Sequence, residues 1–215
     1  MSPEVVVVDY GVGNIFGLSC ALEMAGASVR VSSDPEVVSR AEKVVLPGVG
    51  AFGKAVKELG KRGLRDSVLE VAKKGNKLLG ICLGMQLLLD ESSEHGSWQG
   101  LGLIPGKVEK IPNRNSDGSI LKLPHIGWSP VFVSDAAIKD DNTVFSGIEN
   151  GRTMYFLHSF MVSTSQVEHI RATCTYGDTV ITAAISNDNV IGVQFHPEKS
   201  GNNGLAFLSR FIHSK

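Results

Sequence analysis

The segment around Cys82 limits what this chain can fold into more than any other part of the sequence. The apolar run Lys77–Ile81 has the pattern of a buried strand, and Met85–Leu89 has the pattern of a helix. Cys82 lies on the corner between them, flanked by Gly80 and Gly84. A strand, a tight turn carrying a cysteine and a helix form a nucleophile elbow, with cysteine in place of serine. The alternative is a buried structural cysteine between two packing glycines.

Two physical arguments favour a reactive Cys82. Side chains at Gly80 and Gly84 would collide with the neighbouring backbone or prevent the turn, so both positions require glycine. The amino terminus of the following helix would lie beneath the sulfur and favour the thiolate, which is the reactive form. We therefore expect Cys82 to be a nucleophile lifted above the edge of a sheet.

Length and charge bound the class of protein. The 215 residues suffice for one large domain or two small ones, and we expect a single domain over residues 1–215. A hydrophobic content of 42% with 20% charged residues is ordinary for a soluble globular protein. The net charge of −1 argues against a surface for nucleic acid or for anionic membranes.

The cysteines and the amino terminus indicate a reducing compartment. Cys20, Cys82 and Cys174 are too few and too scattered for a disulfide framework or a zinc site, and we predict no metal and no cofactor. The start has no basic segment, and Val5–Val8 is too short for a signal peptide or a membrane span. We expect a cytoplasmic protein, in which a free thiol stays usable.

Strands and helices alternate in the amino-terminal half of the chain. The apolar patterns predict strands Glu4–Asp9, Val29–Ser33 and Lys43–Leu46 before the elbow strand, and helices over Ile15–Ala25, from Ala51 and over Arg62–Lys74. This order predicts an α/β fold with a doubly wound, mostly parallel open sheet.

Short strands dominate the second half. They are expected at Val108–Ile111, Pro130–Val133, Thr153–Leu157, Ile170–Thr175, Val180–Ile185 and Val190–Phe195. Asp117-Gly118 and Asn187–Asn189 have the composition of hairpin turns. A final helix, Asn203–His213, would pack its apolar side chains onto the sheet.

Two glycine-rich loops follow predicted strands. Gly11 and Gly13 suggest a dinucleotide site, but the third glycine, Gly17, is one place late, and Asn14 is better explained as a helix N-cap. The loop Pro47–Gly50 is an ordinary turn, a phosphate nest or a source of oxyanion donors. In a parallel sheet this loop and Cys82 both lie at the carboxyl ends of strands, where open α/β sheets carry their sites.

A cysteine nucleophile needs a base, and the base needs an orienting carboxylate. Of the six histidines, only His196 has a carboxylate at close and rigid spacing, in Phe195-His196-Pro197-Glu198. Residues two apart in extended chain point to the same side, and proline restricts the pair further. We therefore predict a Cys82–His196–Glu198 triad for acyl transfer through a thioester. The alternative is a surface histidine and glutamate in a proline turn.

These motifs together resemble the triad (class I) glutamine amidotransferases. Three further stretches, Asp9–Asn14, Leu123–Trp128 and Gly192–Gly201, resemble the glutaminase subunit of imidazole glycerol phosphate synthase, and the likeness runs nearly from end to end. Ser129 and Phe160 depart from that pattern, where asparagine and tyrosine are usual. The resemblance implies a flavodoxin-like sheet carrying the elbow.

The resemblance also implies a role for each matching residue. Cys82 would be the nucleophile, His196 the base and acid, and Glu198 the residue that orients it. Glutamine would be held by Gly50, Gln86, His158 and Ser159, although His158 could equally be a strand-end histidine with its bonds satisfied. Oxyanion donors would come from the Leu83 amide and from the loop at Gly48 and Val49, the latter after a backbone flip. Trp128 and His125 would contact a partner.

The implied reaction is hydrolysis of the side-chain amide of glutamine, with ammonia passed directly to an acceptor site. Little of the chain remains to form that second site, so a partner is implied, which the resemblance identifies as a (β/α)8-barrel cyclase subunit in a heterodimer. An uncoupled glutaminase would waste glutamine, so we expect the oxyanion loop to be misaligned until the partner binds its substrate.

Other interpretations remain. The chain could serve another synthase, such as the vitamin B6 enzyme or a surface-sugar amidating paralogue, or it could be a non-catalytic subunit that kept the fold. A cysteine hydrolase of the DJ-1 type is a further alternative. Such proteins usually carry histidine directly after the elbow cysteine, where this chain has Leu83.

Overall fold

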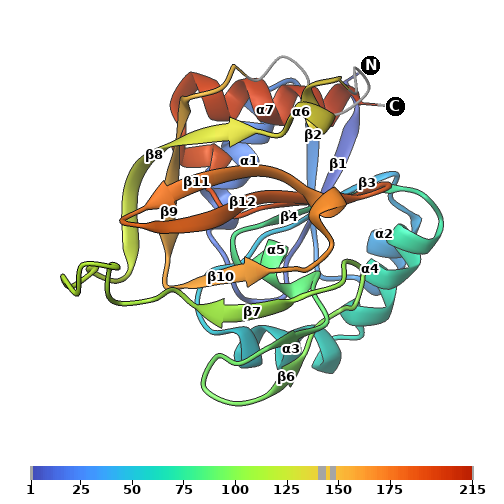
Figure 1. Cartoon of the computed structure of the whole chain (residues 1–215). Coiled ribbons are helices and arrows are strands. Elements are labelled where there is room, and N and C mark those ends of the chain that lie inside the picture. The colour runs from blue at the N-terminus through green and yellow to red at the C-terminus, as the bar shows by residue number, and fades with distance from the viewer. Residues whose placement is uncertain (1, 140–143, 146–148, 215) are drawn as a thin grey trace.

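The computed structural model describes residues 2–139, 144–145 and 149–214. A nine-stranded sheet runs through the molecule in the order β2-β1-β3-β4-β13-β12-β11-β8-β9 (Figure 1). Its first five strands are parallel, and their order is that of a flavodoxin-like sheet. They are β2 (Ser28–Ser32), β1 (Glu4–Val8), β3 (Lys43–Leu46), β4 (Lys77–Ile81) and β13 (Val190–Val193). The predicted doubly wound α/β fold is confirmed.

The central strands are apolar on both faces because helices cover both. In β1, Val5 and Val7 belong to one core and Val6 and Val8 to the other, as the alternation of a strand requires. The first core receives side chains from α1 (Ile15–Met24) and α7 (Gly201–His213), and the second from α2 (Pro35–Arg40), α3 (Phe52–Lys61) and α4 (Leu64–Lys73). Figure 1 shows α1 and α7 together, away from α2, α3 and α4.

The other four strands of the sheet are antiparallel, so the sheet is mixed rather than mostly parallel. They are β12 (Thr179–Asn187), β11 (Ile170–Tyr176), β8 (His125–Val133) and β9 (Arg152–His158). The turn predicted at Asn187–Asn189 joins β12 to β13, and Asp188 adopts a positive φ of 49° there. This hairpin reverses the chain and begins the antiparallel half.

A smaller four-stranded sheet, in the order β10-β7-β5-β6, packs beside the first. It contains β10 (Phe160–Ser163), β7 (Lys107–Lys110), β5 (Glu91–Ser92) and β6 (Trp98–Gln99). The sequence predicted only β7 of these. Strands β5 and β6 have two residues each, too few to carry a periodic pattern, and the four-residue β10 was also missed. The short helices α2 and α6 (Asp135–Lys139) and the 3-10 turns Val167–His169 and Pro197–Lys199 were also not predicted.

Several predicted boundaries differ from the observed ones. The helix after the elbow, α5 (Leu83–Leu87), begins directly after Cys82 instead of at Met85. Helix α4 begins at Leu64, because Gly63 adopts a left-handed conformation and separates it from α3. Strand β13 ends at Val193, two residues earlier than predicted.

Within the described part of the chain, no helix is long and apolar enough to cross a membrane. The same residues contain no cluster of three or more histidine, cysteine, aspartate or glutamate side chains suited to a metal ion. The N-cap predicted at Asn14 is confirmed, since its side chain accepts a hydrogen bond from the amide of Gly17.

Candidate active site

Cys82 lies on a strained corner at the end of β4. Its φ of 54° and ψ of −108° are far from the conformations that a side chain prefers, which is the geometry expected of an elbow. A Cβ at Gly80 would come within 2.6 Å of the Gly84 carbonyl oxygen, and one at Gly84 would overlap the carbonyl of Leu46. Both glycines are therefore required by backbone packing, as predicted.

His196 and Glu198 lie next to each other. The Nδ1 of His196 is 2.9 Å from Oε1 of Glu198, and both side chains are almost fully buried. The route to this contact differs from the prediction of an extended segment. His196 is extended, but Glu198 belongs to the 3-10 turn Pro197–Lys199, which bends its carboxylate back to the imidazole. Because the carboxylate accepts at Nδ1, the other ring nitrogen is available to act on Cys82.

The charge of His196 depends on its neighbours in this structure. Burial lowers the pKa of His196, but its interactions with Cys82 and with Glu198 outweigh burial and raise that pKa to about 10. Among the described residues, Nε2 of His196 has no hydrogen-bond partner, and Cys82 Sγ lies 3.8 Å from the Leu157 carbonyl oxygen. Cys82 thus acts on the charge of His196, although the geometry shows no hydrogen bond between the two side chains.

A pocket of about 330 Å³ opens onto the sulfur of Cys82. All four residues predicted to bind glutamine lie at its wall: Gly50, Gln86, His158 and Ser159. Its remaining lining is Val49, Leu83, Glu94, His95, Pro124, Leu157 and Phe160. The fold thus brings together the ends of β3, β4 and β9, as a site at the carboxyl edge of the parallel strands requires.

The two amides predicted as oxyanion donors, those of Leu83 and Val49, are not available in this conformation. The Leu83 amide donates to the Gly48 carbonyl oxygen at 3.3 Å, so the peptide between Gly48 and Val49 points its oxygen toward the elbow. The amide of Val49 belongs to that same peptide and therefore points the opposite way. A rotation of this one peptide would free Leu83 and turn the Val49 N–H toward the sulfur.

The start of the same loop is held firmly. The hydroxyl of Tyr10 donates to the Pro47 carbonyl at 2.6 Å, and a Cβ at Gly48 would come within 2.5 Å of that hydroxyl. Val49 is 40% exposed, and Gly50 has a positive φ of 105° with nothing near its missing side chain. The loop is thus fixed at Pro47 and open at Val49.

Gln194 contacts Cys82 and was not predicted as a site residue from the sequence. Its side chain is fully buried, and its amide nitrogen lies 3.6 Å from Cys82 Sγ. The amide oxygen of Gln194 accepts from Gln86 at 3.0 Å. A signal was present, since Gln194 is a polar residue inside the apolar run Val190–Phe195.

The side chain of His158 is committed to the protein interior. Its Nδ1 lies 2.8 Å from the Phe160 carbonyl oxygen and its Nε2 lies 3.1 Å from Nδ1 of His125. The alternative of a satisfied strand-end histidine is therefore the observed one, and only the backbone of His158 is left for a ligand. Glu94 was not predicted at the site; its carboxylate accepts from the Phe52 amide at 2.6 Å.

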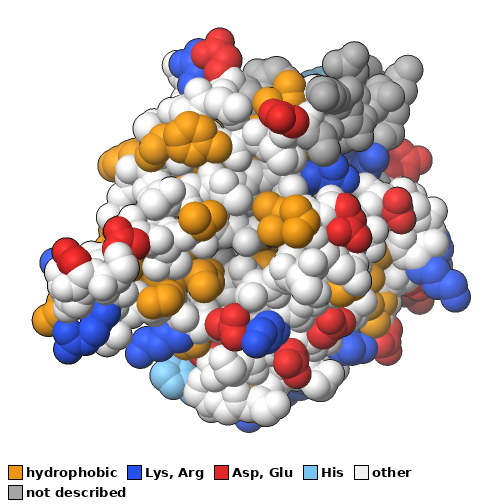
Figure 2. Space-filling view, viewed as in Figure 1, with side chains coloured by type: hydrophobic (Ala, Val, Ile, Leu, Met, Phe, Trp, Pro, Cys, Tyr) orange, Lys and Arg blue, Asp and Glu red, His pale blue; other side chains and the backbone are white. Residues whose placement is uncertain are grey.

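The two residues predicted at a partner interface differ in exposure. Trp128 is 63% exposed and packs against Tyr155 across the β8–β9 pair. His125 is 2% exposed and stacks between Phe156 and Tyr176, so its prediction as an interface contact is wrong. Because side chains alternate along a strand, His125 points inward where Trp128, three residues on, points out. Figure 2 shows apolar side chains exposed on the face in view, including the area of β8.

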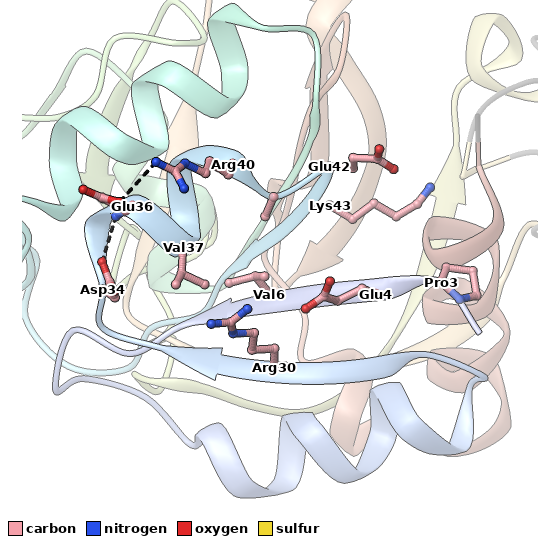
Figure 3. A pocket seen from close by; sticks show the side chains of 11 residues that line it. Pro3, Glu4, Val6, Arg30, Asp34, Glu36, Val37, Arg40, Glu42 and Lys43 are labelled. Atoms are coloured by element: carbon pink, nitrogen blue, oxygen red, sulfur yellow. Dashed lines mark hydrogen bonds and ion pairs between the residues drawn. The ribbon is translucent and has the colours of Figure 1, made fainter. Parts of the chain in front are cut away.

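A larger cavity of about 590 Å³ lies elsewhere, between α2 and strands β1 and β2 (Figure 3). Its charged groups are of both signs and several are already engaged. Asp34 caps α2 by accepting from the Glu36 amide, and the Glu36 carboxylate pairs with Arg40. This cavity contains no cysteine or histidine among the described residues that line it, so the smaller pocket at Cys82 is the candidate active site.

Comparison with known proteins agrees with this geometry. The family described as "Glutamine amidotransferase class-I" matches residues 6–214. The chain is 42% identical to the imidazole glycerol phosphate synthase subunit HisH of Syntrophotalea carbinolica, over 96% of this chain and 98% of that protein. It is also 42% identical to the HisH subunit of Geobacter sulfurreducens, over 99% of each.

Solved structures share the fold at lower identity. PurLQS from Thermotoga maritima superimposes with a TM-score of 0.69 at 22% identity, covering 99% of this chain and 98% of that one. The glutaminase domain of CTPS from Trypanosoma brucei gives a TM-score of 0.65 at 16% identity, covering 100% and 95%. With the elbow, the histidine–glutamate pair and near-complete coverage, this chain belongs to the class I glutamine amidotransferase family and, within it, to the family of HisH subunits.

Proposed function

We propose that this chain is the glutaminase subunit of an imidazole glycerol phosphate synthase and supplies ammonia for histidine biosynthesis. The observation that carries the proposal is the strained Cys82 at a pocket of about 330 Å³, beside a buried His196–Glu198 pair. The names of relatives that are 42% identical along nearly their whole length support the choice of synthase.

In the proposed reaction, the Cys82 thiolate attacks the side-chain carbonyl carbon of glutamine. The tetrahedral adduct collapses, and His196 gives its proton to the departing nitrogen, which leaves as ammonia. His196 then takes a proton from water, and the resulting hydroxide cleaves the γ-glutamyl thioester. Glutamate leaves, and the thiolate–imidazolium pair is restored. The raised pKa of His196 fits this cycle, because the ring must be charged before ammonia departs.

Glutamine would be bound by the polar lining of the pocket. Gly50, Gln86, His158 and Ser159 line it, and their backbone groups and the Gln86 amide would bind the substrate. Glu94 adds a carboxylate there, which suits the α-ammonium group of an amino acid. This assigns substrate binding to the backbone of His158, since its ring is hydrogen-bonded elsewhere.

We further propose that the observed loop is the resting state of a switch. With Leu83 donating to Gly48, the negative oxygen of the tetrahedral adduct would have no donor, and losing an oxyanion donor typically costs about 100- to 1000-fold in rate. Rotation of the Gly48–Val49 peptide would provide two donors at once. Partner and acceptor binding would favour the rotated state, so glutamine is spent only when ammonia has a use.

The proposed partner is a (β/α)8-barrel cyclase subunit in a heterodimer that would work in the cytoplasm. Free ammonia is protonated in water, so the acceptor site must lie against this chain. The exposed Trp128 beside Tyr155, with the Lys199 ammonium 5.5 Å from the Tyr155 ring, is an aromatic anchor of the kind found at the centre of interfaces. The strand β8 carries Trp128 on its outer side and His125 on its inner side.

The test is glutamine turnover by the purified chain, first alone and then in the presence of a ribotide substrate and its barrel cyclase partner. We expect strong stimulation by the liganded partner, and loss of about 1000-fold or more in a Cys82→Ala variant. A Cys20→Ser variant is the matched control, because Cys20 is a half-buried cysteine of α1. A glutamine-analogue electrophile should label wild type and Cys20→Ser but not Cys82→Ala. Turnover that ignores this partner would reassign the synthase, and no turnover with no labelling would refute the proposal.

A further inference from the structure

We infer that Gln194 is a further catalytic residue, whose amide N–H is held against the sulfur of Cys82 by a chain of buried hydrogen bonds that ends at a pair of neutral histidines. The inference rests on the proposed function, because it assigns Gln194 a part in the same thiolate chemistry. The contact itself is direct, with Nε2 of Gln194 lying 3.6 Å from Cys82 Sγ.

The direction of the Gln194 amide follows from its neighbours. Its oxygen accepts from Nε2 of Gln86 at 3.0 Å, and the same Nε2 donates to the Phe160 carbonyl at 3.1 Å. A backbone carbonyl can only accept, so the amide nitrogen of Gln86 must face it. Both N–H groups of Gln86 are then used, and Gln194 must offer its oxygen to Gln86 and its nitrogen to Cys82.

The Phe160 carbonyl is fixed from its other side by His158. Nδ1 of His158 lies 2.8 Å from this oxygen, so Nδ1 carries the proton and Nε2 is an acceptor in the neutral ring. Nε2 lies 3.1 Å from Nδ1 of His125, which must therefore donate. This leaves Nε2 of His125 to accept from the Ser129 hydroxyl at 2.8 Å.

The Phe160 carbonyl therefore determines the tautomers of both histidines and the orientations of both glutamine amides in this hydrogen-bond network. The hydrogen bonds run from Ser129 through His125 and His158 to the Phe160 oxygen, and from Gln86 through Gln194 to Cys82. All the side chains that link these end points are 8% exposed or less. If the Gln194 amide were reversed, its nitrogen would face the Gln86 nitrogen and its oxygen would face the Cys82 sulfur. Both contacts would be unfavourable in a buried network.

The chemical consequence is a second hydrogen-bond donor for the thiolate. His196 lies directly before the 3-10 turn Pro197–Lys199, and Gln194 lies directly after the end of β13. An amide N–H stabilises the thiolate and fixes the direction of the sulfur without competing for the proton that His196 must carry. Gln86 lines the pocket and donates to Gln194, so the residue that orients Gln194 would also lie beside a bound glutamine.

The experiment compares wild type with Gln194→Leu and Gln194→Asn in complex with the barrel cyclase subunit. Leucine has a similar volume but no N–H donor. Asparagine keeps the amide, but its side chain is one methylene shorter, so the N–H lies farther from the sulfur. We expect kcat for glutamine to fall by about 10- to 100-fold, the usual loss for a hydrogen bond to a charged group, with KM changed less than about threefold. The exposed Gln99→Leu is the control.

Two readouts separate a catalytic role from a structural one. The rate of Cys82 alkylation by iodoacetamide at pH 7 and the ultraviolet absorbance of the thiolate should both fall in the folded Gln194 variants, with Cys82→Ala as the blank. Unchanged alkylation, absorbance and kcat in a folded variant would overturn the inference, as would loss of folding in both variants, which would make Gln194 structural. If wild type shows no stimulated turnover while alkylation still depends on Gln194, the proposed function fails and the inference stands.

Discussion

The two walls of the pocket at Cys82 are built differently. One wall carries Cys82, the proposed nucleophile, which is held by close backbone packing, while the proposed base His196 and carboxylate Glu198 form a buried hydrogen-bonded pair. On the other wall, the loop Pro47–Gly50 is anchored by Tyr10 but presents the wrong side of one peptide to the elbow. The first wall is ready for chemistry and the second is not.

This difference shows which wall could change conformation, and so regulate activity, without disturbing the core. Moving Cys82 would require shifting β4 and β13, which are hydrogen-bonded along their length and buried on both faces. Rotating the peptide between Gly48 and Val49 breaks the hydrogen bond from Leu83 and leaves the core untouched. The binding energy of a partner could therefore rotate this peptide. It could not move Cys82, because that would disrupt the core.

The largest predicted effect tests the rigidity of the nucleophile wall. In Gly84→Ala the new methyl group would overlap the Leu46 carbonyl, which belongs to the central strand β3 and cannot yield. We expect a loss of about 4 kcal/mol or more in the free energy of unfolding, with no turnover. Urea denaturation followed by circular dichroism measures it.

The matched control is Gly60→Ala on α3, where a Cβ meets nothing within 4 Å. Alanine in a helix should stabilise the protein there, by about 0.5 to 1 kcal/mol. If Gly84→Ala folded with wild-type stability, the nucleophile wall would be more pliable than its packing indicates, and the contrast between the two walls would disappear.

The next largest effect concerns binding of the proposed partner. If Trp128 is the proposed interface anchor, Trp128→Ala should weaken binding of the proposed barrel cyclase subunit by about 2 to 4 kcal/mol, the range for a central aromatic anchor. Alkylation of Cys82 in the isolated chain should not change, because Trp128 does not line the pocket. Calorimetric titration gives the affinity, and Val180→Ala, also strongly exposed, is the control. An equal loss in both variants would show that Trp128 is not an anchor.

A smaller effect tests the peptide rotation itself. Among the described residues, Val49 is not one of the non-glycine residues with positive φ, and rotating its preceding peptide by half a turn would carry its φ to the positive side. A β-branched residue resists that conformation by about 1 to 2 kcal/mol. Val49→Gly removes this resistance, so the unstimulated glutaminase rate should rise by about tenfold.

The rate with liganded partner should change much less in Val49→Gly, because under the proposed switch the wild-type loop would already be rotated in that state. The ratio of stimulated to unstimulated turnover is therefore the measurement. A variant with both rates lowered equally would indicate that Val49 serves packing, and the switch would have to lie elsewhere in the loop.

How much the sequence revealed differs between the walls for a physical reason. The elbow could be predicted because Gly80, Cys82 and Gly84 lie within a few residues of one another on the chain, and parallel βα units give strong periodic patterns. His196 and Glu198 could be paired from their spacing, although the 3-10 turn that joins them could not. Local chemistry was enough for these residues.

Contacts between distant segments were not accessible in the same way. The role of Gln194 depends on Gln86, 108 residues away, and the burial of His125 depends on its stacking against Phe156 and Tyr176. The blocked Leu83 amide depends on which way a single peptide faces, which no side chain in the sequence encodes. Strands β5 and β6 are two residues long and form only through pairing, β5 with the longer β7 and β6 with β5.

The smallest predicted effect concerns the pH dependence of stability, which depends on the buried histidines His125 and His158. Burial lowers the pKa of both His125 and His158 from 6.5 to about 4. The unfolded chain therefore binds protons below pH 6.5 that the folded chain refuses until about pH 4, and stability is lost as the pH falls through that window. For each ring, the free energy of unfolding should fall by about 1 kcal/mol between about pH 7 and pH 5.5.

His125→Phe isolates this contribution, because phenylalanine keeps a ring between Phe156 and Tyr176 but cannot bind a proton. The variant should be less stable than wild type at neutral pH, since His158 and Ser129 each lose a partner. Its further loss on going to about pH 5.5 should nevertheless be smaller than that of wild type by about 1 kcal/mol, measured by urea unfolding at both values. The exposed His213→Gln is the control, because it removes no buried ring. Equal pH dependence in wild type and His125→Phe would mean that the rings accept protons while folded, and the neutral histidines that fix the direction of the hydrogen bonds toward Phe160 would not exist.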